Sequence, residues 1–280
     1  MRVSRRLALG ALLLALAMPL AAAPRVQVRK PRLLLVPESM VNQTAAQQYA
    51  QMKQQAAARR VLNSDAPSVA RARAIAARLI PHASRFNDKA ARWQWEVNVI
   101  DAPMVNALCM PGGKIMVFAG LIDKLKLSDD ELAAVIGHEI AHAALEHGRA
   151  RMSEAILKKV GVNLAAAYFG LSPAGTAALA QAAQLAVTLP YSRSHETDAD
   201  LVGIELAARA GFDPRAAVSV WRKMSRLGGN QPQQLLSTHP AHATRIRDLE
   251  AALPKVLPLY LEARRMPPAN EPGTPPARTR

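Results

Sequence analysis

The segment VIGHEIAHAALEHG, residues 135–148, concentrates side chains that could bind a metal ion. His138 and His142 are four residues apart, so on an α-helix they would lie on one face and present two imidazole nitrogens to one ion. Glu139 would lie about 100° around the helix axis, where its carboxylate could activate a water molecule. This pattern is typical of metal-dependent hydrolysis. Because HExxH is short enough to occur by chance, the alternative is a helix with a polar edge.

A catalytic zinc ion needs a third protein ligand, and the same helix does not supply one. In the extended pattern HExxHxxGxxH, the glycine and the third histidine would fall at Leu145 and Gly148, and neither matches. His147 follows His138 by nine residues, which on a continuous helix turns it about 180° away from the histidine pair. We therefore interpret His147 as a residue at the end of the helix, near the negative end of the helix dipole.

The second dense polar patch is SRSHETDAD, residues 192–200. Glu196 and Asp200 are four residues apart on an expected helix, so one carboxylate could bind zinc while the other accepts the free ring N–H of a ligand histidine. We predict Glu196 as the ligand and Asp200 as the support. His195 and Asp198 point to other faces and are expected to be solvent-exposed or capping residues.

A third polar element is STHPAHATR, residues 237–245, which combines His239, Pro240 and Arg245. Alone it indicates little, because Thr-His-Pro is ordinary at a helix start. It becomes informative because it follows the other two elements in the chain.

The three elements together resemble peptidase family M48, the zinc endopeptidases that include the CAAX prenyl protease, HtpX and the Oma-type proteases. The pattern of that family is HExxH, ExxxD and HPxxxxR, which stand here as HEIAH (138–142), ETDAD (196–200) and HPAHATR (239–245). The segment NALCMPGGKIMVFAGLI (106–122) is similar to the stretch before the metal helix of the family. The resemblance covers about residues 100–247.

The resemblance implies a gluzincin-type site for one Zn²⁺ per chain, with Glu139 as the general base. Three ligands are implied: His138, His142 and Glu196. Asp200 and Arg245 are expected to support the ligands without touching the ion. Two roles are open for His239. It could donate a hydrogen bond to the oxyanion, or it could occupy the open zinc position and keep the enzyme latent until substrate displaces it.

Short strands and many helices are expected to position these residues. Alternating side chains indicate strands within WQWEVNVI (93–100), APMVNALCM (102–110) and KIMVFAG (114–120), the last two joined as a hairpin by Pro-Gly-Gly. A capping box, SDDE, predicts that the metal helix begins at Ser128 and continues to about Gly148. Other helical patterns cover 44–62, 68–80, 151–169, 174–188, 194–210, 214–227 and 241–252. The expected fold class is α+β, mainly helical, with a small mixed sheet packed beside the metal helix.

Substrate is expected to bind as an added strand, because main-chain hydrogen bonds tolerate many side chains. The predicted edge strand consists of Lys114, Ile115, Met116, Val117, Phe118 and Ala119. A covered, purely structural strand is the alternative. Cys109 is interpreted as a small buried hydrophobic residue, with a regulatory thiol as the alternative.

The ends of the chain predict secretion. Residues 1–23 have the basic start, apolar core and small-residue end of a signal peptide, and no cysteine follows the cleavage site to take a lipid anchor. Residues 24–37 are expected to form an extended lead-in, 38–252 the metalloprotease domain and 253–280 a proline-rich, disordered tail. The expected location is a bacterial periplasm, in soluble form.

Charge and composition restrict the partners. The net charge is +15, and removal of the three signal-peptide arginines leaves +12, but aromatic residues make up only 4% and no nucleic-acid module appears, so nucleic acid is not an expected partner. Residues 160–192 carry no charge and are expected to form a helical hairpin, with peripheral membrane contact as the alternative. The expected function is cleavage of unfolded or misfolded polypeptides in envelope quality control. A zinc-stabilised, chaperone-like binding protein and a membrane-surface adaptor are the rivals, and the oligomeric state is open.

Overall fold

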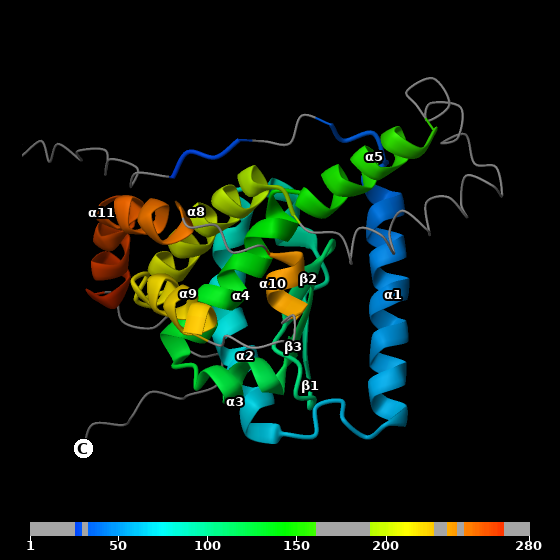
Figure 1. The fold of residues 1–280 in the computed structure, drawn as a ribbon, viewed down its shortest axis with the longest axis horizontal. Helices are drawn as coiled ribbons and strands as arrows, with labels where there is room; N and C mark the ends of the chain where they lie inside the picture. The colour runs from blue at the N-terminus through cyan, green and yellow to red at the C-terminus, as the bar shows by residue number, and fades with distance from the viewer. Residues whose placement is uncertain (1–25, 30–32, 161–190, 227–233, 240–243, 266–280) are drawn as a thin grey trace, which may run out of the picture.

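The computed structural model describes residues 26–29, 33–160, 191–226, 234–239 and 244–265 (Figure 1). Its strands are β1 (Glu96–Ile100), β2 (Ala107–Met110) and β3 (Lys114–Phe118). Its α-helices are α1 (Glu38–Ala58), α2 (Ala66–Leu79), α3 (Ala119–Leu125), α4 (Asp129–Ala144), α5 (His147–Val160), α8 (Arg193–Arg209), α9 (Ala216–Arg226), α10 (Gln234–Thr238) and α11 (Thr244–Arg265). Two 3₁₀ helices, η1 (Ile80–Arg85) and η2 (Asp88–Arg92), follow α2. The expected class, mainly helical with a small mixed sheet, is confirmed.

The sheet has the strand order β1-β3-β2, with β1 parallel and β2 antiparallel to β3. The β2–β3 hairpin turns through Gly112 and Gly113, whose φ angles of 80° and 84° suit glycine. A Cβ at Gly113 would also lie 2.7 Å from the Trp95 ring. The prediction that 114–119 forms an edge strand is wrong, because β3 is the central strand and Ala119 already begins α3. Sequence alternation cannot tell a central strand from an edge strand when the neighbour, here β1, comes from earlier in the chain.

The two faces of β3 bury different sets of side chains, as the period of two in a strand requires. Ile115 and Val117 belong to the main core, which contains residues of α2, α4 and α8. Met116 and Phe118 belong to a second core with Tyr49 of α1. Helix α1 therefore covers one face of the sheet and the metal helix lies on the other side (Figure 1).

Helix α4 begins as predicted and ends early. The Ser128 hydroxyl accepts a hydrogen bond from the Glu131 N–H at 3.2 Å, and the Glu131 carboxylate accepts one from the Ser128 N–H at 2.8 Å. The expected end at about Gly148 is wrong, because the helix stops at Ala144 and Glu146 takes a φ of 57°. A second helix, α5, then starts at His147 in a new direction.

The C-terminal helix is longer than predicted. Helix α11 runs to Arg265 with Pro254 and Pro258 inside it, so residues 253–265 are not a disordered tail. Prolines normally break helices, but here the buried side chains of Val256 and Leu259 hold the helix against the core. The predicted signal peptide, the remaining tail (266–280) and nearly all of the uncharged segment (161–190) lie outside the described residues.

The lead-in has neither helix nor strand in residues 26–29 and 33–37. Its backbone is held by side chains of α8: the Val26 N–H donates to Glu205 at 2.6 Å and the Arg29 N–H to Asp198 at 3.3 Å. Among the described helices, none is long and apolar enough to span a bilayer.

Candidate metal centre

Two glycines let the helices that carry the polar motifs approach closely. A Cβ at Gly203 of α8 would lie 2.9 Å from the His138 backbone nitrogen, and one at Gly137 of α4 would lie 3.0 Å from the Gly203 carbonyl oxygen. Any side chain at either position would push the helices apart. The glycine pair thus sets α4 directly against α8 and brings their polar residues within reach of each other.

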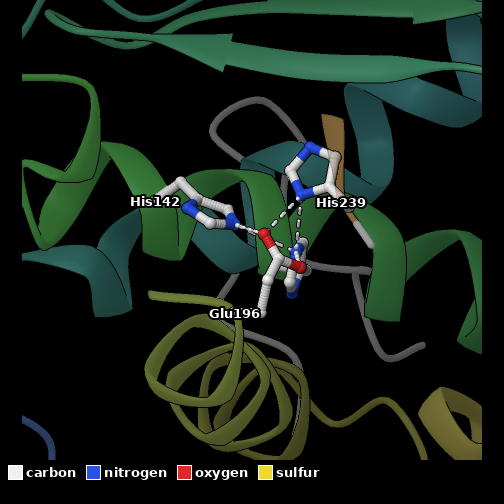
Figure 2. Close-up of side chains that lie close together, drawn as sticks. His142, Glu196 and His239 are labelled. Carbon is white, nitrogen blue, oxygen red and sulfur yellow. Dashed lines mark hydrogen bonds and ion pairs between the residues drawn. The ribbon is translucent and has the colours of Figure 1, made fainter. Parts of the chain in front are cut away.

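Four buried side chains converge at this helix pair: His138, His142, Glu196 and His239. One donor atom from each lies within 4.8 Å of the others. Figure 2 shows the His142 and His239 rings pointing at the Glu196 carboxylate, which projects from α8. The Glu196 Oε1 atom lies 3.4 Å from His142 Nε2 and 3.0 Å from His239 Nδ1, and Oε2 lies 3.5 Å from His138 Nε2.

The donor set fits a zinc ion. Three imidazole nitrogens and a carboxylate oxygen face one another, and Nε2 of His142 lies only 3.0 Å from Nε2 of His138. Such a buried group of acceptor atoms needs a shared proton or a cation between them. Nitrogen and carboxylate ligands in this number match the preferences of Zn²⁺.

Burial and contact shift the ligands' proton affinities in opposite directions. Burial acts to raise the pKa of Glu196, but its contacts with the three histidines outweigh this and hold the pKa well below its usual range. Burial acts to lower the pKa of His138, but Asp200 and Glu196 raise it to about 9. For His142, burial dominates and lowers the pKa well below 6.5. The two histidines of one motif are therefore electrostatically different.

His138 is supported by charged groups. Its Nδ1 atom lies 3.0 Å from Oδ1 of Asp200, the contact expected for that carboxylate. Arg245 donates two hydrogen bonds to Asp200, at 2.7 and 2.6 Å, and forms a 2.6 Å ion pair with Glu196. Its guanidinium also lies 3.6 Å from the centre of the Trp221 ring. One buried arginine thus positions the two carboxylates of the ExxxD motif.

His142 is supported by a second histidine that sequence reasoning placed wrongly. The Nδ1 atoms of His147 and His142 are 2.9 Å apart, so one ring donates and the other accepts. His147 is fully buried because the break at Glu146 redirects it toward α4. No glycine or proline in residues 144–147 signals this break.

Aromatic stacking surrounds this second support. The Tyr191 ring stacks on His142 with centroids 3.8 Å apart, and the His195 ring stacks on His147 at 4.3 Å. The Arg151 guanidinium lies 3.4 Å from the Tyr191 ring centre. The expectation that His195 and Asp198 are exposed is wrong, because both are buried, His195 against His147 and Asp198 under the lead-in.

Glu139 is buried beside the cluster. Its Oε1 atom lies 3.5 Å from His239 Nε2, and polar contact with the Cys109 backbone of β2 acts to lower its pKa. Burial raises the pKa of Glu139, the direction that suits a carboxylate that takes up and then releases a proton. Cys109 itself is a buried free thiol whose pKa is raised by burial, in agreement with its interpretation as a small hydrophobic residue.

A cavity reaches Glu139 and His239, which are among its lining residues. One wall is α1, with Val41 and Ala45, and the other is the β2 region, residues 106–111. The outer edge of β2 therefore borders a space that ends at the metal cluster. Lys114–Ala119 line no part of it.

A His-His-Glu set presented by two packed helices beside a small mixed sheet is typical of the gluzincin class of metal site. The chain belongs to peptidase family M48: the model of that family, "Peptidase family M48", matches residues 69–253. The match includes the HExxH, ExxxD and HPxxxxR elements.

Several characterised proteins are similar to the chain. It is 40% identical over 172 residues to "Mitochondrial metalloendopeptidase OMA1" of Arabidopsis thaliana, an alignment that covers 60% of this chain and 34% of that protein. It is 33% identical over 153 residues to "Metalloprotease LoiP" of Escherichia coli, covering 53% and 60%, and 29% identical over 146 residues to "Metalloprotease YcaL", covering 52% and 57%. The matches thus span between about a third and three fifths of these relatives' lengths.

Proposed function

We propose that this protein is a zinc-dependent endopeptidase that cleaves unfolded or misfolded polypeptides. The observation that carries the proposal is the position of Glu139. Its carboxylate is buried beside the four-residue cluster, at the end of a cavity bordered by a strand edge. A protein that only binds its clients would have no need of a base beside the metal ligands. The metalloendopeptidase relatives support the same activity.

Different residues of the chain would bind the ion and transfer the proton. His138, His142 and Glu196 would hold the ion, and when bound, zinc polarises the scissile carbonyl and makes water a stronger nucleophile. Glu139 accepts the proton of the attacking water and passes it to the leaving amine. Its raised pKa suits both steps, because the carboxyl group must first take up the proton and then release it.

We propose that substrate binds along β2, and not along β3. The carbonyls of Asn106 and Met110 accept hydrogen bonds on the hairpin side of the strand, so the backbone groups of Ala107 and Cys109 point to the outer edge. Cys109 and Glu139 line the same cavity, in agreement with this orientation. A peptide added at this edge would gain main-chain hydrogen bonds and lie beside the base. Recognition of the backbone favours unfolded chains of varied sequence.

For His239, the geometry favours the latch. Its Nδ1 atom lies 3.0 Å from Glu196 and 3.3 Å from Nε2 of His138, among the other ligand atoms. As a fourth ligand it would close the position that water and substrate need. A His239→Ala variant that cleaves faster supports the latch, and one that loses activity supports the role of oxyanion donor.

The place of action is also a proposal. The predicted signal peptide favours a soluble periplasmic protein that works in envelope quality control, with residues 160–192 as its route to membrane contact. Cell fractionation tests the location. Liposome binding that survives both zinc removal and high salt would indicate contact through this uncharged segment, whereas salt-sensitive binding would indicate the basic surface of the adaptor alternative.

Cleavage of casein tests the activity. The full chain, loaded with zinc, is incubated with casein with and without a zinc chelator, and Glu139→Gln is run alongside. We expect cleavage that the chelator stops and that Glu139→Gln lowers by at least about 100-fold, in line with the loss of general-base catalysis. If neither the wild type nor His239→Ala cuts casein, a chaperone-like holding function replaces the peptidase.

A further inference from the structure

A second cavity adjoins the metal centre on the side of α8 and α9. Glu139 and His239 line both this cavity and the one beside β2, so the pair stands where the two meet. The new cavity is lined mainly by apolar side chains from three helices, α4, α9 and α10: Val135, Ala217, Val220, Trp221, Met224 and Leu235. We call it the α9 pocket.

Two carboxylates line the α9 pocket, those of Asp200 and Glu139. Asp200 lines it but lies against His138 and Arg245, and the Arg245 guanidinium is also covered by the Trp221 ring. A negatively charged side chain entering the pocket would lose its water beside the carboxylates of Asp200 and Glu139, and a positively charged one could meet only Glu139, the proposed base. An apolar side chain would lose nothing comparable and would gain the contact of the walls.

We propose that the α9 pocket binds the side chain of one residue that flanks the scissile bond, and that it selects a small or medium aliphatic residue such as valine or leucine. This inference rests on the proposed function. Because Glu139 lines both cavities, a peptide that lies along β2 and passes Glu139 would place one flanking side chain beside the α9 pocket. Backbone contacts at β2 would then accept many sequences, while the pocket adds preference at one position.

The size of the pocket supports an aliphatic residue. Its volume is about 30 Å³, the room of about two water molecules on the same measure. That space suits a few carbon atoms and is too small for an indole ring. Met224 lines one wall, and its unbranched, flexible side chain can adapt to an added methylene group.

A peptide series tests the inference. Each peptide carries alanine, valine, leucine, phenylalanine, tryptophan, aspartate or lysine on one side of the cleaved bond, and kcat/KM is measured by mass spectrometry with the full, zinc-loaded chain. We expect valine and leucine to exceed aspartate and lysine by about 10- to 100-fold at one flanking position only, since single groups in apolar pockets discriminate to about that degree.

Two variants change the pocket in opposite directions. Ala217→Leu fills it, and we expect kcat/KM for the leucine peptide to fall about tenfold while the alanine peptide changes less than about twofold. Met224→Ala enlarges it, and the optimum should move toward phenylalanine. Ala251→Leu makes the same change as the first variant at an exposed position of α11 and should leave the profile intact. Circular dichroism and zinc content show whether each variant is folded and loaded.

The outcomes separate the two proposals. A flat profile in the wild type, or an unchanged profile in both folded variants, overturns the α9 pocket as a subsite while the peptidase stands. Absence of cleavage of every peptide by both wild type and His239→Ala overturns the proposed function and this inference with it. If Ala217→Leu does not fold, the shift expected for Met224→Ala decides alone.

Discussion

His138 and His142 belong to one motif on one helix, yet opposite kinds of structure support them. On the His138 side, Asp200, Arg245 and Glu196 form a network of buried charges. On the His142 side, His147 and the rings stacked around it provide a neutral, aromatic support. The charged side fixes ligand geometry strongly but depends on every member, because an unpaired buried charge is costly. The aromatic side depends less on any single group.

The largest effect should come from Arg245→Ala. The change leaves two buried carboxylates, Asp200 and Glu196, without their cation, which typically costs about 3–5 kcal/mol of unfolding free energy. Chemical denaturation of the metal-free protein measures it. Arg245→Lys should restore only part of the loss, because an ammonium group cannot make the two parallel hydrogen bonds to Asp200. A loss below about 1 kcal/mol in Arg245→Ala would contradict the importance of the charged side.

Asp200→Asn tests the contact with His138 itself. The amide keeps the shape of the carboxylate but not its charge, so it holds the ring of His138 less firmly. We expect zinc affinity to fall about 10- to 100-fold, the usual cost of losing such a partner. Competition with a chromogenic chelator measures the affinity, and Asp123→Asn, which changes an acidic residue of α3 away from the site, is a matched control.

His147→Phe tests how much the contact on the aromatic side contributes to zinc affinity. Phenylalanine can keep the stack on His195 but removes the nitrogen that faces His142. We expect zinc affinity to fall by roughly tenfold, at the low end of such effects, because a neutral imidazole is the weaker partner. A loss greater than that of Asp200→Asn would reverse the ranking of the two supports.

The smallest effect should come from Tyr191→Leu. The ring stacks on His142 and receives the Arg151 guanidinium, and such aromatic contacts contribute about 0.5–1.5 kcal/mol. Thermal unfolding should therefore shift by a few degrees, with zinc affinity within about threefold of the wild type. Tyr191→Phe keeps the ring and should match the wild type in both measurements.

The metal cluster was predictable because its members stand in short motifs with helical spacing. His138, His142, Glu196 and Asp200 could be placed from intervals of four residues, and His239 from the order of the motifs. These intervals carry geometric information that holds in any helix.

Other features depend on contacts between distant segments. The break at Glu146 has no local signal, so a continuous helix placed His147 on the wrong face. Nothing in KIMVF tells that β1, from earlier in the chain, pairs with its second edge. The prolines of α11 are local signals that point the wrong way, because the packing of Val256 and Leu259 outweighs them. Tertiary packing decided each of these cases.

The contact between Gly137 and Gly203 limits how far the spacing of the metal ligands can change. Zinc–ligand distances vary by only about 0.2 Å, whereas a single Cβ at Gly203 would require its neighbours to move by several tenths of an ångström. The two glycines therefore set the distance between α4 and α8 within a narrow range. Zinc affinity therefore depends on the distance between these two helices, and even a methyl group at Gly137 or Gly203 would lower it.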